Sequence, residues 1–196
     1  MSGKGKEFRP ICDTWLLAPS KIGYYGAYPN GFMQRARCLL CRMDEPLLHV
    51  CSGRVRDYPG YGVGSSDRTL DLNPAVSPDY LQDARDPWPT CSPGWPAILA
   101  DPPYTEADAD HYLQYWSTDA GQLSLALPSP SQLVNRAMEA LRPGGKFGIL
   151  HYLHPKIPTR ARLVACVAVQ QGANTRGRWF TVLEKELDHW DRTRGG

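Results

Sequence analysis

The sequence predicts an α/β fold with a mainly parallel sheet, and three observations support this expectation. Short apolar runs typical of buried strands alternate along the chain with amphipathic and loop segments. The chain has 196 residues, which is enough for one domain with a sizeable core. Near the C-terminal end, two apolar runs flank a glycine-containing turn at 172–177, and this pattern predicts an antiparallel hairpin.

The predicted elements follow one another in chain order. Residues 1–20 are expected to form an N-terminal tail and residues 21–196 a single domain. Apolar residues at helical spacing predict a helix over 31–43 and a second over 132–141, which ends at the turn 142–145. The apolar runs that predict strands lie at 47–51, 69–72, 97–100, 146–152, 163–169 and 179–187. Ligands bind outside the carboxyl ends of parallel strands, so the residues that follow each strand are the candidates for a site.

The charge balance does not point to a nucleic-acid binder. Lys and Arg total 22 and Asp and Glu total 20, which gives a net charge of +2. A protein of this charge lacks the strong basic field that attracts a nucleic acid. Local basic clusters could contact phosphates or could be solvated surface, and they lie at 4–9, 35–42, 156–162 and 176–178.

The six cysteines favour a cytoplasmic protein with free thiols and no metal site. They lack the spacing of a secreted disulfide framework, and the sequence shows no signal peptide or long apolar span. Cys38 and Cys41 have the spacing of half a zinc site, but no second pair accompanies them. We expect both thiols to pack as small hydrophobic groups on one face of a helix.

The most informative segment is Asp101, Pro102, Pro103 and Tyr104, which directly follows the predicted strand at 97–100. The two prolines fix φ and remove backbone donors, so the chain forms a stiff loop at the end of the strand. The Asp101 carboxylate and the carbonyl beside the prolines are acceptors, and the Tyr104 ring is a flat stacking surface. The combination suits a planar group that bears an –NH2, such as a nucleobase; an ordinary turn after a strand is the alternative.

This segment resembles the DPPY motif of S-adenosylmethionine-dependent amino-methyltransferases, which act on adenine N6 or cytosine N4, mostly in DNA. Further segments resemble the family's other motifs in the family's order, and they are the glycine loop at 51–53, the acid Asp71, the pair at 83–84 and the turn at 141–145. The resemblance covers roughly residues 47–187. It implies a Rossmann-like class I methyltransferase with a mostly parallel seven-stranded sheet, a C-terminal antiparallel hairpin and S-adenosylmethionine as cofactor.

The resemblance also implies roles for individual residues. Cys51, Ser52 and Gly53 would form the loop that holds the methionine end of the cofactor, and Phe32 would cover that end. Asp71 would accept hydrogen bonds from the two ribose hydroxyls. Asp83, beside Ala84, would accept one from the cofactor's adenine amine.

At the catalytic loop, the resemblance implies that Asp101 and the Pro102 carbonyl accept both hydrogens of the target amine. Tyr104 would stack on the target base, which in duplex DNA must first be flipped out. Two features depart from the family: His49 stands where an acid is often found, and the segment 57–64 is too broken for the usual helix. Other candidates near the site have a substrate role or a structural one, and they are Tyr24, Tyr25, Tyr28, Trp88, His111, Tyr112, Tyr115, Trp116, His151 and His154.

The stretches between Tyr104 and Gln132 and after Tyr152 are too short for a target-recognition domain. Specificity is therefore expected to be short, relaxed or supplied by a partner protein, and no membrane partner is predicted. The predicted function is transfer of a methyl group from S-adenosylmethionine to an exocyclic nucleobase amine, first of all adenine N6 in DNA. RNA, cytosine N4 and protein glutamine are alternative targets. A non-catalytic scaffold subunit and an enzyme that transfers another group remain alternatives.

Overall fold

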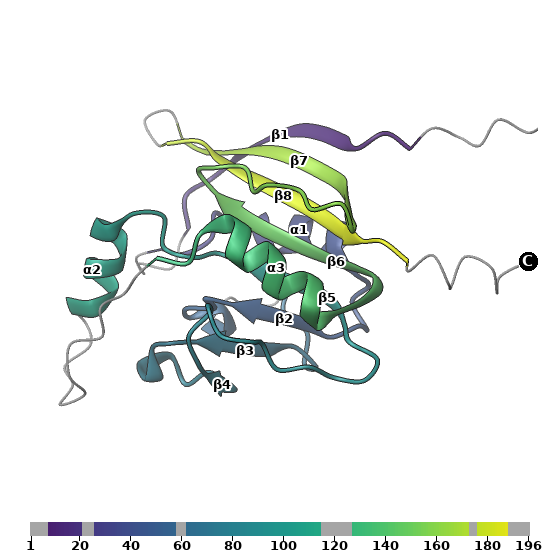
Figure 1. Ribbon diagram of the computed structural model, residues 1–196. Coiled ribbons are helices and arrows are strands. Elements are labelled where there is room, and N and C mark those ends of the chain that lie inside the picture. The colour runs from purple at the N-terminus through teal and green to yellow at the C-terminus, as the bar shows by residue number, and fades with distance from the viewer. Residues whose placement is uncertain (1–7, 21–25, 58–61, 115–126, 173–175, 188–196) are drawn as a thin grey trace, which may run out of the picture.

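An eight-stranded sheet forms the centre of the computed structural model, which describes residues 8–20, 26–57, 62–114, 127–172 and 176–187 (Figure 1). The strand order is β1-β7-β8-β6-β5-β2-β3-β4. Neighbouring strands run parallel except at β8, which is antiparallel to both β6 and β7. The strands are β1 Ile11–Leu17, β2 Leu47–Val50, β3 Arg68–Asp71, β4 Tyr80–Leu81, β5 Trp95–Ala100, β6 Leu141–His151, β7 Ala161–Gln171 and β8 Arg178–Lys185. The predicted mostly parallel sheet with a C-terminal antiparallel hairpin is confirmed.

Helices cover both faces of the sheet. Helix α3 (Pro130–Ala140) lies on the near face in Figure 1 and α1 (Phe32–Leu40) on the far face, while α2 (Glu106–Gln114) projects beyond the end of β5. Each covering helix buries one apolar stripe, and the two stripes belong to separate hydrophobic clusters. Helix α3 begins with a capping box, in which the Ser129 side chain accepts from the Gln132 backbone and the Gln132 side chain accepts in return. Short 3-10 turns lie at Val55–Asp57 and Pro74–Val76.

Strand β1 differs from the expected N-terminal tail. Residues Ile11–Leu17 pair in parallel with β7, so the sheet has an eighth strand in addition to the seven that the family resemblance implies. Trp15 and Leu17 are buried and Leu16 is exposed, because alternate residues of a strand point to opposite faces. The Trp15 ring contacts Phe32 and Phe180, which anchors the strand to the core beneath it.

The segment 142–145 also differs from its prediction as a turn. It lies within the start of β6, which begins at Leu141 directly after α3, and the pairing of β5 with β6 shifts register between Trp95 and Ala97. Gly94, with φ +120, approaches the Arg142 backbone so closely that a Cβ on Gly94 would lie 2.5 Å from the Arg142 nitrogen. Glycine is therefore required where these two segments meet.

No helix in the described part of the chain is long and apolar enough to cross a membrane.

Candidate functional site

A cavity opens at the carboxyl ends of β2, β3 and β5, where the parallel strands bring their following loops together. It contains about 980 Å³ of empty space, counting the part that is open to solvent. The predicted site residues among its lining are Cys51, Ser52, Gly53, Asp71, Asp83, Ala84, Asp101 and Pro103. Several further lining residues belong to no motif that the sequence shows, and they include Arg54, Asn73, Val76, Ala109 and Pro128.

Asp71 ends β3 and joins the strand to the loop after β2. Its carboxylate accepts from the Gly53 backbone N–H at 2.7 Å and from the Asn73 N–H at 2.8 Å. Burial raises the pKa of Asp71, and the backbone hydrogen bonds oppose that rise. A carboxylate has about four acceptor positions. The positions that the backbone leaves free can receive hydroxyl groups of a ligand in the cavity.

The loop after β2 contains a buried hydroxyl with no partner among the described residues. Ser52 is 6% exposed and lines the cavity, and its Oγ makes no hydrogen bond there. Its neighbours Cys51 and Gly53 have φ values of +52 and +48, which hold the loop in a tight left-handed turn. A buried hydroxyl without a partner is costly, so this one indicates a polar ligand group in the cavity.

Asp83 lies in the cavity with its carboxylate already paired. Arg85 donates to both oxygens of Asp83 through its side chain, at 2.6–3.0 Å, and also through its backbone N–H. The hydrogen bonds from Arg85 lower the pKa of Asp83, against the effect of burial. The predicted acceptor for an adenine amine is thus present, but Arg85 shares it.

Phe32 does not lie where the family resemblance implies. It is fully buried in the core and does not line the cavity. Its ring stacks on Tyr28 with ring centres 4.9 Å apart, and Tyr28 lines the cavity in its place. Phe32, the first residue of α1, therefore supports Tyr28 from behind, because its side chain packs in the core against Trp15 and Phe180.

Gly26 and Tyr112 are far apart in the sequence, but both line the cavity and they lie close to each other. A Cβ on Gly26 would collide with the hydroxyl of Tyr112 on α2, and Gly26 has φ +77. Glycine at 26 therefore lets the segment before α1 and helix α2 approach each other closely. The side chain of His111 and the whole of Tyr24, Tyr25, Tyr115 and Trp116 lie outside the described residues.

The loop after β5 holds Asp101 at the cavity and directs Tyr104 elsewhere. Asp101 and Pro103 line the cavity, whereas Pro102 and Tyr104 do not. The Tyr104 ring packs against His151 and Tyr152, with ring centres 5.3 and 4.5 Å away, and its hydroxyl donates to Asp101 Oδ1. Burial raises the pKa of Asp101 to about 6, although Arg178 and the Tyr104 hydroxyl lower it.

His49 stands at the position where the family often has an acid, and its side chain pairs with another residue of the core. Its ring lies 3.2 Å from Asp67, whose two oxygens accept from Arg37 at 2.8 and 2.7 Å. Asp67 also accepts from the backbone of Leu47 and Gly64. Arg37, His49 and Asp67 are each at most 5% exposed. This buried network fastens β2 to α1 and to the loop before β3.

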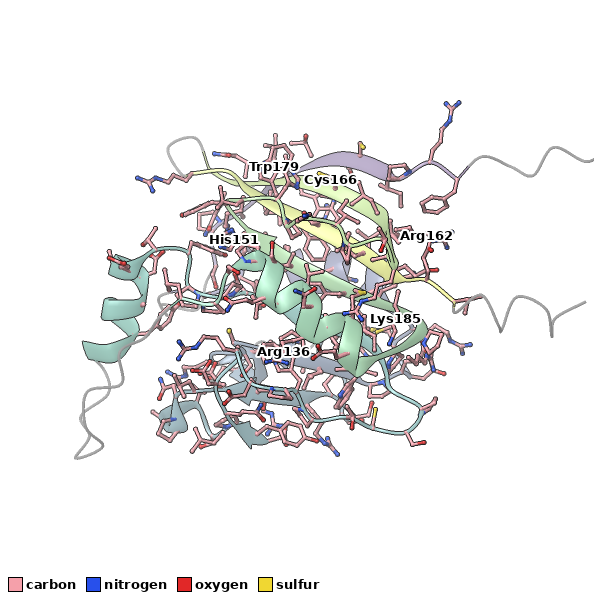
Figure 2. All side chains as sticks on the ribbon, in the orientation of Figure 1. Arg136, His151, Arg162, Cys166, Trp179 and Lys185 are labelled. Atoms are coloured by element: carbon pink, nitrogen blue, oxygen red, sulfur yellow. The ribbon has the colours of Figure 1, made fainter. Side chains whose placement is uncertain are left out.

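The three remaining candidates are Trp88, His151 and His154, and none of them lines the cavity. Trp88 is buried and donates its indole N–H to the Ala84 carbonyl, which supports the loop that carries Asp83. His154 packs on Trp179 at 4.6 Å, and its Nδ1 lies 3.2 Å from the Thr181 hydroxyl. His151 contacts Tyr104, and Figure 2 shows it on β6 below Trp179.

The sequence matches no protein-family model and no curated protein. Among solved structures, the chain is similar to TrmN from Thermus thermophilus, with 19% identity, 78% of this chain and 48% of that chain covered, and a TM-score of 0.49. This chain thus spans about half the length of TrmN. An rRNA methylase from Streptococcus thermophilus shares 10% identity over 82% of this chain and 98% of its own, with a TM-score of 0.43. The strand order, with antiparallel β8 between β6 and β7, gives this chain the Rossmann-like fold of class I methyltransferases.

Proposed function

We propose that the protein transfers a methyl group from S-adenosylmethionine to an exocyclic amine of a nucleobase, with adenine N6 in DNA as the first candidate. The observation that carries the proposal is one cavity that unites Asp71, at the end of β3, with Asp101, at the end of β5. These two acids follow different strands and belong to motifs with different roles. Their meeting in one cavity is what a reaction between a nucleoside cofactor and an amine requires.

The cavity fits S-adenosylmethionine at two points. Asp71 retains acceptor positions for the ribose hydroxyls, and the unpartnered Ser52 hydroxyl can bind a polar group of the methionine end. Tyr28 and Gly26 would then cover that end, while Asp83 and Ala84 border the place for the adenine. When bound, the cofactor supplies an electrophilic methyl group on a sulfonium.

The loop that carries Asp101 would orient the target amine for attack on the methyl group. The nitrogen lone pair of a nucleobase amine is delocalised into the ring, so the amine is a poor nucleophile. Asp101 Oδ2 would accept one of its hydrogens and turn the lone pair toward the methyl group. Acceptance of the second hydrogen by the Pro102 carbonyl stays a prediction, since Pro102 does not line the cavity. The amine becomes acidic as the C–N bond forms, so positioning and electrostatics supply most of the rate. Stacking of the base on Tyr104 stays a prediction, since the described Tyr104 ring already packs against Tyr152.

The test is calorimetric binding of S-adenosylmethionine to the wild type, to Asp71→Ala and to Asp44→Ala. Asp44 is an exposed residue that pairs with Arg42 and does not line the cavity, which makes it a matched control. We expect micromolar binding that Asp71→Ala weakens at least tenfold and Asp44→Ala leaves unchanged. Binding that survives Asp71→Ala would move the cofactor elsewhere.

Radiolabelled methyl transfer to DNA, RNA and protein would then identify the acceptor. Transfer to RNA, to cytosine or to protein glutamine would replace adenine in DNA as the substrate. Absence of cofactor binding by the folded wild type would favour a scaffold subunit. The pairing of Asp83 with Arg85 is the observation in favour of that second candidate, because it occupies the acceptor expected for the adenine amine.

A further inference from the structure

Arg178 belongs to none of the motifs described above, but its side chain contacts the loop at 101–104 directly. It is the first residue of β8, and its Nη1 donates to the Tyr104 hydroxyl at 3.3 Å. Its Nη2 donates to Gln171 Oε1 at 3.4 Å, across the hairpin at the end of β7. These contacts hold a half-buried guanidinium against the ring that follows the two prolines.

A chain of hydrogen bonds runs from Arg178 through the Tyr104 hydroxyl to Asp101 Oδ1. The hydroxyl accepts from the guanidinium and donates its own hydrogen to the carboxylate, so both ends of the chain are charge-assisted. Asp101 Oδ1 is thereby occupied, and Oδ2 is left for a ligand in the cavity. The same chain fixes the rotation of the carboxylate, which otherwise could turn about its χ2 torsion.

We propose that Arg178 is a positioning residue, which holds the Tyr104 hydroxyl against Asp101 and keeps that carboxylate ionised and turned toward the amine substrate. This inference rests on the proposed function for the identity of the substrate but not for the contact with Asp101. In the reaction, Arg178 would keep the Asp101 side chain a hydrogen-bond acceptor beside the target nitrogen at neutral pH, where a protonated acid could not accept in the same way.

The groups that face Asp101 explain why a cation is needed there. Burial raises the pKa of Asp101, and Asp108 on α2 adds to the rise, whereas Arg178 from β8 and the Tyr104 hydroxyl lower it. The buried thiol of Cys51 also lines the cavity, and burial raises its pKa, so it stays neutral and adds no negative charge beside Asp101. In return, Asp101 and the Tyr104 hydroxyl raise the pKa of Arg178 against the effect of its own burial. Arg178 is thus the cation that opposes the desolvation of Asp101.

The first measurement is the titration of Asp101 by 13C NMR of its carboxyl carbon, in the absence of substrate and cofactor. In Arg178→Met, we expect the proton affinity of Asp101 to rise about tenfold, because the opposing cation is lost. Arg178→Lys keeps the charge and should restore most of the wild-type titration. The matched control is Arg176→Met, because Arg176 precedes the same strand but lies exposed, 6.0 Å from the Tyr152 ring.

Tyr104→Phe keeps Arg178 and removes only the linking hydroxyl, so it tests the chain independently should Arg178→Met fold poorly. It should also raise the proton affinity of Asp101. An unchanged titration in both Arg178→Met and Tyr104→Phe would overturn the proposal.

Kinetics separate this proposal from the proposed function. In Arg178→Met, we expect kcat at pH 7 to fall about tenfold and KM for the cofactor to stay within twofold, since the affected group faces the amine. Equal losses in kcat and in cofactor affinity would contradict a positioning role. A wild type that shows the titration difference but neither binds the cofactor nor transfers methyl would refute the proposed function alone.

Discussion

Asp101 is the residue at which burial and chemistry conflict most directly. The proposed reaction needs its ionised form as an acceptor, while burial raises its pKa to about 6. An acid with a raised pKa in the folded state destabilises the fold as it ionises. The stability contributed by the protonated acid is fully present below its unfolded pKa and is lost as the pH rises through its folded pKa of about 6.

We predict that Asp101→Asn removes this pH dependence. Relative to the wild type, the variant should gain stability between pH 4 and pH 7, by up to roughly 3 kcal/mol for a pKa displaced by about two. Urea unfolding of both proteins at several pH values measures the difference. The methyl-transfer rate of the wild type should rise with an apparent pKa near 6 and that of the variant should stay flat. Parallel stability curves for the two proteins would contradict the prediction.

The residues of the site differed in how well the sequence predicted them. Asp71 and Asp101 end buried strands, and the rule for parallel sheets places such residues at one edge, so the sequence predicted that they meet. Phe32 was assigned only by position, and the sequence could not tell which face of α1 it occupies relative to the cavity. Arg178 had no local signal beyond its charge, because its contact with Tyr104 depends on how β8 pairs with β6.

Among the elements, β2 depends on a charged network behind it. Arg37 and Asp67 are almost completely buried, and Asp67 joins α1, β2 and the loop before β3. Burial opposes ionisation of Asp67, but the hydrogen bonds from His49 and Arg37 outweigh it and lower the pKa of Asp67. Loss of one member leaves an unpaired buried charge, which typically costs 3–5 kcal/mol.

We predict that Asp67→Asn destabilises the protein by roughly 3–5 kcal/mol at pH 7. The loss should shrink as the pH falls from about 4 through the lowered pKa of Asp67, because the wild type then loses the same charge. Urea unfolding measures both effects. The control is Asp44→Asn, which breaks the exposed pair with Arg42 and should cost about 0–1 kcal/mol. Similar losses in the two variants would show that the buried network is not the support of β2.

Elements with local signals were predicted and those set by distant pairing were not. Helices α1 and α3 carry apolar stripes at helical spacing, and β2, β3 and β5 are short apolar runs, so the sequence located all five. Strand β1 carries polar residues at Asp13 and Thr14 and follows a proline, and its partner β7 lies at the other end of the sequence. Nothing local in residues 11–17 indicates that pairing.

On the scale of the whole molecule, β1 ties the start of the chain to its last hairpin. It covers the open edge of β7 (Figure 1). Its buried Trp15 contacts α1 through Phe32 and β8 through Phe180. The chain then runs from β1 toward Gly26 and Tyr28 at the cavity. We therefore expect the edge strand to unfold together with the sheet, so that a change in it affects the unfolding of the entire sheet.

Two neighbouring residues of β1, Trp15 and Leu16, differ sharply in burial. Trp15→Ala removes a ring that is 6% exposed, whereas Leu16→Ala trims a side chain that is 78% exposed on the opposite face. We expect the first change to cost roughly 3–5 kcal/mol, through lost burial and the cavity left behind, and the second to stay within about 0.5 kcal/mol. Urea unfolding followed by far-UV circular dichroism measures both, and the loss in Trp15→Ala should appear as an earlier midpoint of one transition. An early separate transition, with the main midpoint unchanged, would instead mean that β1 unfolds without the sheet.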